Sequence, residues 1–317
     1  ESRCQMKHLL LTTIAAVLFI NSICAESITP KIPRTSLISH KVKINDHTFA
    51  VYEKKADNPT DIILFVHGRT ISSLPNFNLL IESKNVSLMD AFAAKGFTVY
   101  AIDLRGFGNT PRDDSGWITP DKASNDVMKM LEWIAARHPK NKKPTLFGYS
   151  LGSLVSHLVV QQEPKLVSGL VLFGHPIRYL DKIDVSAIKK DKSTMNPPRK
   201  PNTVEWSSDG FITNSIPQEV IDGYVSACLS LDPILVDWNN IAQWNQLDPQ
   251  AITVPTLLIN GEHDPYAPAD KLASFFNKIG NSDKSWVVIS KSGHNAHIED
   301  SAVRLVNGIV NFVRRHK

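Results

Sequence analysis

The chain has 317 residues, of which 42% are hydrophobic and 21% are charged. This composition is typical of a globular protein, and the length suffices for one large α/β domain that carries an insertion. The formal net charge of +4 is too small and too dispersed along the chain to indicate nucleic-acid binding.

The N-terminal segment is typical of a secretory signal peptide. Met6, Lys7 and His8 form a short basic start, residues 9–20 form an apolar run, and cleavage is expected after Ala25. The run is too short for a stable membrane span, although an uncleaved signal anchor is the alternative. We therefore expect export to the periplasm or the medium.

The mature domain is expected to comprise residues 26–317. Cleavage removes Cys4 and Cys24, so Cys228 becomes the only cysteine and no intramolecular disulfide is possible. The five residues before Met6 are interpreted as an upstream extension or an alternative start.

Strand-like segments occur from residue 36 onward. Residues 36–54 alternate and predict two antiparallel strands joined at Asn45-Asp46. Residues 62–66 and 97–102 are continuous apolar runs, which is the pattern of buried parallel strands.

Helix-like segments alternate with these strands. Ser87 has a capping pattern that opens a helix ending at Gly96, and residues 70–86 before it predict a long loop. Further helices are expected over residues 124–138 and 300–315. Such alternation predicts a parallel sheet with right-handed crossovers.

The most informative motif is Gly148-x-Ser150-x-Gly152. An apolar strand over residues 144–147 enters it and a helix over residues 151–162 leaves it. In this context the serine occupies a sharp, strained turn, and the glycines avoid collisions with the neighbouring strand and helix. The pattern predicts a serine nucleophile that points away from the sheet.

A serine nucleophile needs a base and a group that orients the base. Asp264 follows the apolar strand that begins at Pro255, and His294 follows a strand over residues 286–289. The chain order Ser, Asp, His is the one expected when the nucleophile lies on a strand–turn–helix element. Ser150, Asp264 and His294 are therefore the predicted catalytic residues.

On these motifs the sequence resembles the α/β-hydrolase family. The resemblance covers residues 40–317 and also depends on motifs after strands at residues 65–69, 103–108, 261–264 and 293–299. It implies an α/β-hydrolase fold, with a mostly parallel eight-stranded sheet flanked by helices and a helical cap insertion. It says less about the substrate, because one fold supports many chemistries.

The resemblance also implies roles for individual residues. Ser150 would attack the carbonyl carbon, His294 would transfer the proton, and Asp264 would hold the imidazole. The backbone N–H groups of Arg69 and Leu151 would form the oxyanion hole. The Arg69 side chain either adds positive charge at the pocket mouth or points to solvent. A serine at this position, rather than an aspartate, indicates acyl transfer.

The regular alternation breaks between two strands, and the resemblance implies that residues 175–252 form a cap over the site. Aromatic side chains in this insertion are candidates for substrate contacts. These are His175, Trp206, Tyr224 and Trp238, and the alternative is that they pack the insertion on the sheet. No metal-ligand spacing and no phosphate-binding loop is present in the sequence, so we expect neither a metal nor another cofactor.

Three functions fit these observations. The first is an exported serine hydrolase that cleaves carboxylic esters of small to medium acyl groups, with a small-molecule ester as its partner. The second is a peptidase that resembles proline iminopeptidases, in which Glu205, Glu219 or Asp222 would bind a free amino terminus. The third is a binding protein without catalysis, against which the complete triad argues. The sequence does not indicate an oligomeric state.

Overall fold

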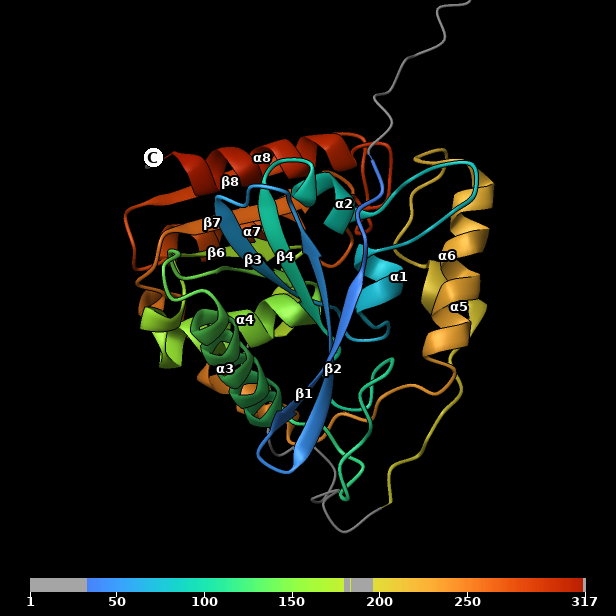
Figure 1. Ribbon diagram of the computed structural model, residues 1–317, viewed down its shortest axis with the longest axis horizontal. Coiled ribbons are helices and arrows are strands. Elements are labelled where there is room, and N and C mark those ends of the chain that lie inside the picture. The colour runs from blue at the N-terminus through green and yellow to red at the C-terminus, as the bar shows by residue number, and fades with distance from the viewer. Residues whose placement is uncertain (1–32, 180–182, 184–195, 316–317) are drawn as a thin grey trace, which may run out of the picture. The chain divides into compact units, whose positions relative to one another are not determined.

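Figure 1 presents a computed structural model of the chain, which describes residues 33–179, 183 and 196–315. The expected signal peptide, residues 1–25, lies outside these residues, so its cleavage stays a prediction. Within the described residues, no helix is both long and apolar enough to cross a membrane.

An eight-stranded sheet forms the centre of the fold. The strands are β1 (Ile38–Ile44), β2 (His47–Lys55), β3 (Asp61–Val66), β4 (Phe97–Ile102), β5 (Thr145–Tyr149), β6 (Gly169–Phe173), β7 (Thr256–Gly261) and β8 (Lys284–Ile289). They lie in the order β1-β2-β4-β3-β5-β6-β7-β8. The β1–β2 and β2–β4 pairs are antiparallel and the other pairs are parallel. The expected eight-stranded, mostly parallel sheet is thus confirmed.

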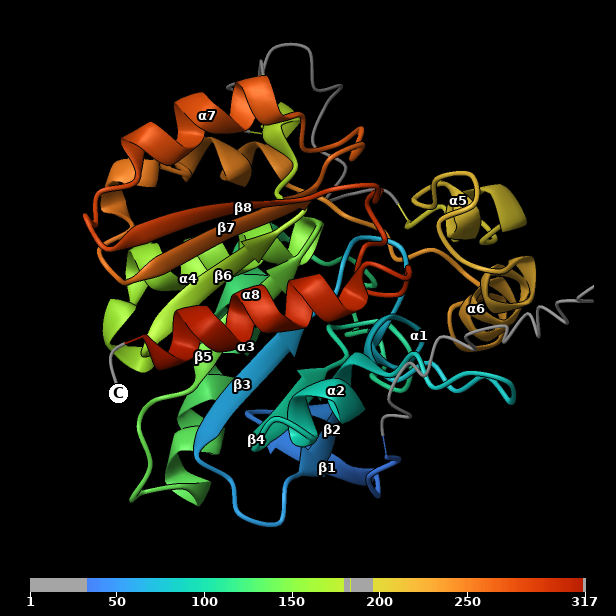
Figure 2. The same cartoon turned by 90° about the horizontal axis from the view of Figure 1, so that it is seen from above.

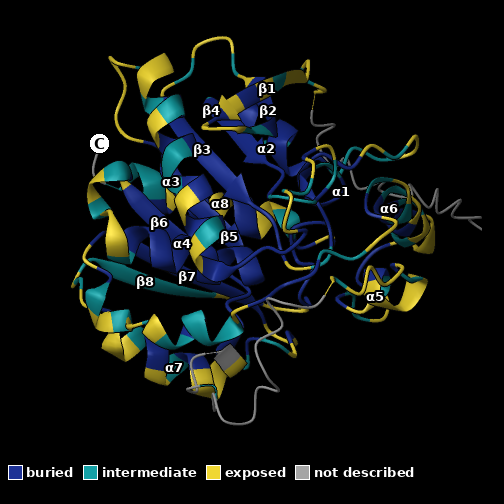
Figure 3. Cartoon of the chain, turned by 90° about the horizontal axis from the view of Figure 1, so that it is seen from below, coloured by how far each residue is buried: buried dark blue, intermediate teal, exposed yellow. Residues whose placement is uncertain are grey.

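Helices cover both faces of the sheet. The α-helices are α1 (Ser73–Phe77), α2 (Leu88–Ala93), α3 (Pro120–Arg137), α4 (Leu151–Gln162), α5 (Val204–Ser208), α6 (Gln218–Leu231), α7 (Ala269–Lys278) and α8 (Ala302–Arg314). Helices α3, α4 and α7 pack on one face, and α1, α2 and α8 pack on the other (Figure 2). The central strands between the two layers are buried (Figure 3).

The apolar run of β3 is buried at every position, which explains its continuous hydrophobic sequence. Phe65 on this strand lies in an aromatic cluster that joins the sheet to α1 and α2. The centroid of its ring is 4.9 Å from that of Phe147, 5.1 Å from that of Phe77 and 5.4 Å from that of Phe92. Aromatic pairs at such separations stabilise beyond the area that they bury.

The stretch over residues 70–86, expected to be a loop, contains the short helix α1. Ser73 explains the difference, because its N–H donates to Asp103 Oδ1 at 2.9 Å and its hydroxyl donates to the Ile102 carbonyl at 2.7 Å. These contacts link α1 to the end of β4. A pattern confined to the local sequence does not reveal such tertiary bonds.

Helix α3 begins four residues earlier than expected, at Pro120. Thr119 caps it, with a side-chain oxygen that accepts from the Lys122 N–H at 3.2 Å. Proline is favoured at the first helical position, where no acceptor exists for an N–H group. The expected cap of α2 is present as well, since Ser87 Oγ accepts from the Asp90 N–H at 3.1 Å.

The segment between β6 and β7 leaves the sheet and carries α5 and α6 beyond the carboxyl ends of the parallel strands (Figure 2). The same segment contains the 3-10 turns η2 (Ile177–Tyr179), η5 (Ile241–Gln246) and η6 (Pro249–Ala251). Val220 and Tyr224 on α6 are buried together with Ile71, which follows β3, and Ile298, which follows β8. The segment therefore packs on the loops that follow the strands, where a cap is expected.

A buried ion pair joins the antiparallel edge of the sheet to α2. Lys54 Nζ lies 2.6 Å from Asp90 Oδ1, and both side chains are almost fully buried. Asp90 also accepts from the Thr35 N–H at 2.9 Å and from Asn85 Nδ2 at 3.0 Å. These hydrogen bonds compensate the carboxylate for its lost hydration.

Lys54→Met should lower the free energy of unfolding by about 3–5 kcal/mol, because it leaves the Asp90 carboxylate buried without its cation. Urea unfolding followed by circular dichroism measures this change. Lys129→Met is the control, since Lys129 pairs with Glu132 on the surface. It should change stability by less than about 1 kcal/mol. Equal effects of the two substitutions would contradict the role given to the Lys54 pair.

Candidate active site

The turn between β5 and α4 holds Ser150 in a strained backbone conformation. Its φ of 53° and ψ of −126° lie outside the regions that non-glycine residues favour. The Ser150 N–H donates to the Phe173 carbonyl at 2.9 Å and fastens the turn to β6. Such strain costs about 1–3 kcal/mol and persists where the surroundings enforce it.

The glycines on either side of the serine permit close backbone contact. A Cβ on Gly152 would overlap the carbonyl oxygens of Val66 and His67, and a Cβ on Gly148 would lie 2.5 Å from the Ser153 Cα. Gly152 therefore lets helix α4 approach the end of β3 closely, and Gly148 lets the start of α4 pack against β5. This packing accounts for both glycines of the motif.

The loops after β7 and β8 bring His294 and Asp264 together. His294 Nδ1 lies 2.8 Å from Asp264 Oδ2, and both side chains are buried. The other carboxylate oxygen of Asp264 accepts from the Tyr266 N–H at 2.9 Å. Gly174 lies against the pair, because a Cβ there would be 2.8 Å from His294 Cε1. The imidazole is thus fixed by a carboxylate, while its Nε2 is left for other chemistry.

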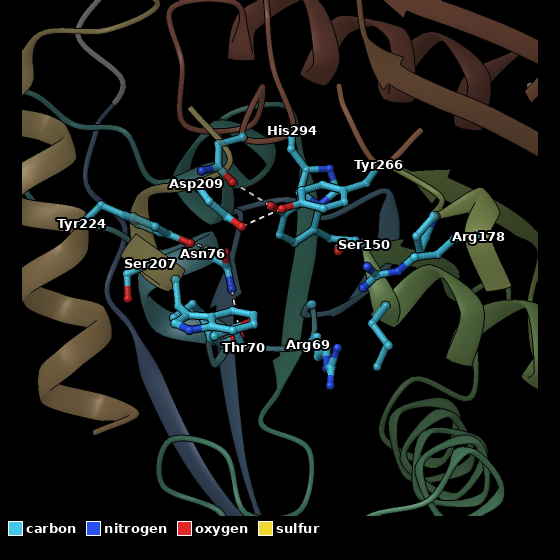
Figure 4. Close-up of a pocket in the computed structure, with 17 residues that line it drawn as sticks. Arg69, Thr70, Asn76, Ser150, Arg178, Ser207, Asp209, Tyr224, Tyr266 and His294 are labelled. Carbon is cyan, nitrogen blue, oxygen red and sulfur yellow. Dashed lines mark hydrogen bonds between the residues drawn. The ribbon is translucent and has the colours of Figure 1, made fainter. Parts of the chain in front are cut away.

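Ser150 and His294 both line a cavity of about 170 Å³ at the carboxyl ends of the strands (Figure 4). The loops after β3, β7 and β8 contribute to its lining, and so do the turn at Ser150 and helix α6. This is the edge at which parallel α/β sheets bind ligands. The arrangement places a hydroxyl, an imidazole and backbone N–H groups around one small space.

His67 organises the loop that carries the first predicted oxyanion donor. Its Nε2 accepts from the Leu104 N–H at 3.0 Å, so its Nδ1 carries the proton and donates to the Gly68 carbonyl at 2.8 Å. A trans peptide directs its C=O and N–H to opposite sides, and the Arg69 N–H therefore points away from His67. Burial lowers the pKa of His67 to about 4, so the ring is neutral near pH 7.

The same loop lies against Ser150, the predicted nucleophile. A Cβ on Gly68 would be 3.1 Å from the Ser150 Cβ and 3.6 Å from its Oγ. Leu151, which carries the second predicted donor, is the first residue of α4. Its N–H has no acceptor within the helix and lies at the positive end of the helix dipole. The positions of both backbone donors suit a negative charge that develops next to Ser150.

The family comparison agrees with this geometry. A family model described as "Serine aminopeptidase, S33" matches residues 57–301. The chain belongs to this family of α/β-hydrolases. It is a hydrolase by family, and its fold is that of the superfamily.

Individual relatives are distant. The chain is 23% identical over 279 residues to AB hydrolase superfamily protein YisY of Bacillus subtilis, covering 83% of this chain and 95% of the relative. It is 23% identical to sn-1-specific diacylglycerol lipase ABHD11 of Xenopus laevis, covering 87% of this chain and 86% of the relative. A thermophilic esterase from Thermogutta terrifontis has a similar fold, with a TM-score of 0.65, 18% identity, and coverage of 88% of this chain and 98% of the esterase.

Two of the four residues predicted to contact substrate line the cavity of this hydrolase. Tyr224 lies on α6 and its hydroxyl donates to Asn76 Oδ1 at 3.0 Å, and Trp206 on α5 is half-exposed. The other two lie elsewhere. His175 is fully buried behind the nucleophile turn, with Nδ1 at 2.7 Å from Ser153 Oγ.

Trp238 is also absent from the lining, because its ring packs in the core at 5.9 Å from the ring of Trp244. Backbone pairing with Ile118 draws this segment toward the sheet. His175 and Trp238 were predicted to contact substrate, and neither lines this cavity. Both residues pack the structure that surrounds the site.

Several lining residues were missed by sequence reasoning. Among them are Asn76, Arg178, Asp209, Tyr266 and Asn295. Asn295 directly follows His294 and Tyr266 follows Asp264 by two residues, and this proximity was the local signal for both. The others come from segments whose side-chain directions depend on tertiary packing. Within the described part of the chain, no group of three or more His, Cys, Asp or Glu side chains could hold a metal ion.

Gly174→Ala should slow labelling of Ser150 by a fluorophosphonate at least about tenfold, because the new Cβ would displace the His294 ring. Mass spectrometry of the labelled protein measures the rate. Gly308→Ala is the control, since a Cβ there would make ordinary contacts with Ile259 Cδ1 at 3.6 Å and Val287 Cγ1 at 4.0 Å. It lies within α8 and should stabilise the fold by about 0.5–1 kcal/mol without changing the labelling rate.

His297 makes stability depend on pH. It is fully buried against Tyr149 and Phe173, and neither ring nitrogen has a hydrogen-bond partner among the described residues. Burial, and secondarily the charge of His294, lower its pKa to about 3. Below pH 6.5 the unfolded chain binds a proton that the folded chain excludes, so stability is lost as the pH falls toward 3.

His297→Leu should therefore lose about 2 kcal/mol less stability than the wild type between pH 7 and pH 5. Urea unfolding at both values measures the difference. His263→Leu, at an exposed site, should retain the pH dependence of the wild type. Parallel losses in His297→Leu and the wild type would show that His297 does not exclude the proton.

Proposed function

We propose that this protein is a serine hydrolase that cleaves carboxylic esters of small to medium acyl groups. The observation that supports the proposal most directly is the shared cavity of Ser150 and His294, together with the 2.8 Å contact from His294 to Asp264. A strained serine, an oriented imidazole and backbone donors are the groups that acyl transfer requires.

The first half of the reaction forms an acyl-enzyme. His294 Nε2 accepts the Ser150 proton as Oγ bonds to the carbonyl carbon, and Asp264 stabilises the resulting imidazolium. The carbonyl oxygen becomes an anion and accepts from the N–H groups of Arg69 and Leu151. The proton then passes from His294 to the leaving alkoxide, and the C–O bond of the ester breaks.

The second half removes the acyl group. His294 Nε2 takes a proton from a water molecule as the water oxygen bonds to the acyl carbon. The same backbone donors hold the second oxyanion. Collapse of this intermediate returns the proton to Ser150 Oγ and releases the carboxylic acid, so the enzyme is restored without a cofactor.

The dimensions of the cavity favour small esters. Its volume of about 170 Å³ is below the roughly 300–1,000 Å³ of pockets that hold drug-sized ligands. Trp206 stands half-exposed at its edge, where a longer acyl chain could extend toward solvent. Short chains therefore fit entirely inside, and medium chains would extend past α5.

The peptidase alternative receives less support from the geometry. Glu205, Glu219 and Asp222 were its candidates for binding an amino terminus, and none of them lines the cavity. Glu219 accepts from Ser83 and Asp222 accepts from Gln218, both on the exposed surface. Asp209 is the one carboxylate among the described lining residues, and it accepts from the Tyr266 hydroxyl at 2.6 Å.

Export is part of the proposal. It depends on the basic start at Met6 and the apolar run over residues 9–20, which together have the order of a signal peptide. Cleavage after Ala25 would release residues 26–317 into the periplasm or the medium.

The test combines fluorophosphonate labelling with hydrolysis of p-nitrophenyl esters from acetate to laurate. Ser150→Ala should abolish labelling, and Asp264→Asn should lower kcat by roughly 10⁴-fold because the imidazole loses its productive tautomer. Ser156→Ala should leave both unchanged, because Ser156 is buried on α4 outside the cavity lining.

Three other results would redirect the assignment. Turnover of aminoacyl p-nitroanilides in preference to esters would favour the peptidase. Folded protein that neither reacts with the probe nor hydrolyses any ester would favour a binding protein. Equal ester hydrolysis by Ser150→Ala and the wild type would contradict the assignment of Ser150 as the nucleophile.

A further inference from the structure

The cavity lining carries an excess of positive charge. Among the described residues that form it, Arg69 and Arg178 are cationic and Asp209 is the one carboxylate. Asp209 already accepts the short hydrogen bond from the Tyr266 hydroxyl. A negatively charged group that enters the cavity would meet Arg178, whose guanidinium points toward Ser150, and Arg69, whose guanidinium points away from Ser150 (Figure 4).

The exposed side chain of Arg69 does not take part in the interactions that stabilise the fold. Its side chain has no hydrogen bond and no ion pair within the described part of the chain. Other arginines hold carboxylates, with Arg105 at 2.6 Å from Asp126 and Arg315 at 2.6 Å from Asp283. A guanidinium presents a planar fork of donors that matches a carboxylate in two parallel hydrogen bonds. At Arg69 this fork is available to a ligand.

The backbone fixes where this cation acts. The N–H of Arg69 is a proposed oxyanion donor, and Gly68 before it lies against Ser150. The Arg69 side chain therefore starts beside the reacting carbonyl, and rotation about its side-chain bonds would bring the guanidinium toward an acyl group bound there. Arg178 lines the same cavity from the loop after β6, with its guanidinium carbon 5.9 Å from the centre of the Tyr266 ring.

We propose that Arg69, assisted by Arg178, selects acyl groups that carry a carboxylate a few bonds from the scissile carbonyl. The substrate class is then the monoesters of short dicarboxylic acids. This inference depends on the proposed esterase function and narrows it. The carboxylate stays on the acyl group, so Arg69 holds it during both the formation and the hydrolysis of the acyl-enzyme.

The charge has a second consequence. A cation that attracts a carboxylate repels the α-ammonium group of an aminoacyl substrate. The geometry thus opposes the peptidase alternative through charge as well as through the position of its acids. Because Arg69 is exposed, salt should weaken this selection strongly.

The experiment compares two esters of matched length, monomethyl glutarate and methyl pentanoate, which differ by a carboxylate in place of a methyl group. Acid release in a pH-stat gives kcat/KM for each. The wild type should prefer monomethyl glutarate by about tenfold or more, the range expected of a hydrogen-bonded ion contact. Adding about 0.5 M NaCl should reduce this ratio several-fold.

Substitutions test whether the preference for monomethyl glutarate depends on the guanidinium groups. Arg69→Gln should lower the ratio about tenfold, and Arg69→Lys should retain an intermediate ratio, because lysine keeps the charge without the planar fork. Arg178→Gln is a second variant at the cavity and should lower the ratio too. Lys165→Gln removes an exposed cation outside the lining and should leave both esters unaffected.

The possible failures are distinguishable. Hydrolysis of methyl pentanoate that depends on Ser150, with a wild-type ratio at or below one, would overturn the inference and leave the esterase intact. A wild-type ratio that is retained in Arg69→Gln and Arg178→Gln would also overturn it. No turnover of either ester and no labelling by the fluorophosphonate would overturn the proposed function and the inference together.

Discussion

The close contact between helix α4 and the end of strand β3 is the constraint on which the site depends. Gly152 lies directly against the carbonyl oxygens of Val66 and His67, and no side chain fits there. Strand β5 and helix α4 must then be joined by a sharp turn at Ser150, which gives this residue its positive φ. The strain of about 1–3 kcal/mol is small beside the apolar face that α4 buries through Leu154 and Leu158. The core therefore maintains the strained turn at Ser150, the proposed nucleophile.

Backbone contact also determines where His294, the proposed base, lies. Gly261, at the end of β7, lies directly against the carbonyl oxygens of Ser292 and Gly293 in the loop that carries His294. Glu299 holds that loop from the other side, because its carboxylate accepts from the Gly293 N–H at 2.9 Å and from the Ile212 N–H at 3.3 Å. Ile212 belongs to the segment between β6 and β7, so this segment and the histidine loop are held by the same carboxylate.

The features that could be predicted from the sequence are those set by the backbone and by the order of the strands. The strands, the turn at Ser150 and the loops of Asp264 and His294 each follow from a local pattern at a strand end. The surroundings of the aromatic side chains in the insertion could not be predicted in this way. Trp206 and Trp238 have similar local sequence signals, yet one edges the cavity and the other packs on the core. That difference arises from tertiary packing, which periodicity does not encode.

The loop after β3 combines two kinds of electrostatic interaction in one residue. The Arg69 N–H is held in place by His67 through the Gly68 carbonyl, whereas the Arg69 side chain is free to follow a ligand. A nearby cation stabilises any oxyanion to some degree, so its removal can slow neutral esters as well as charged ones. Absolute rates therefore mix catalysis with recognition. Only the ratio between two esters isolates specificity, because the shared contribution to the oxyanion cancels.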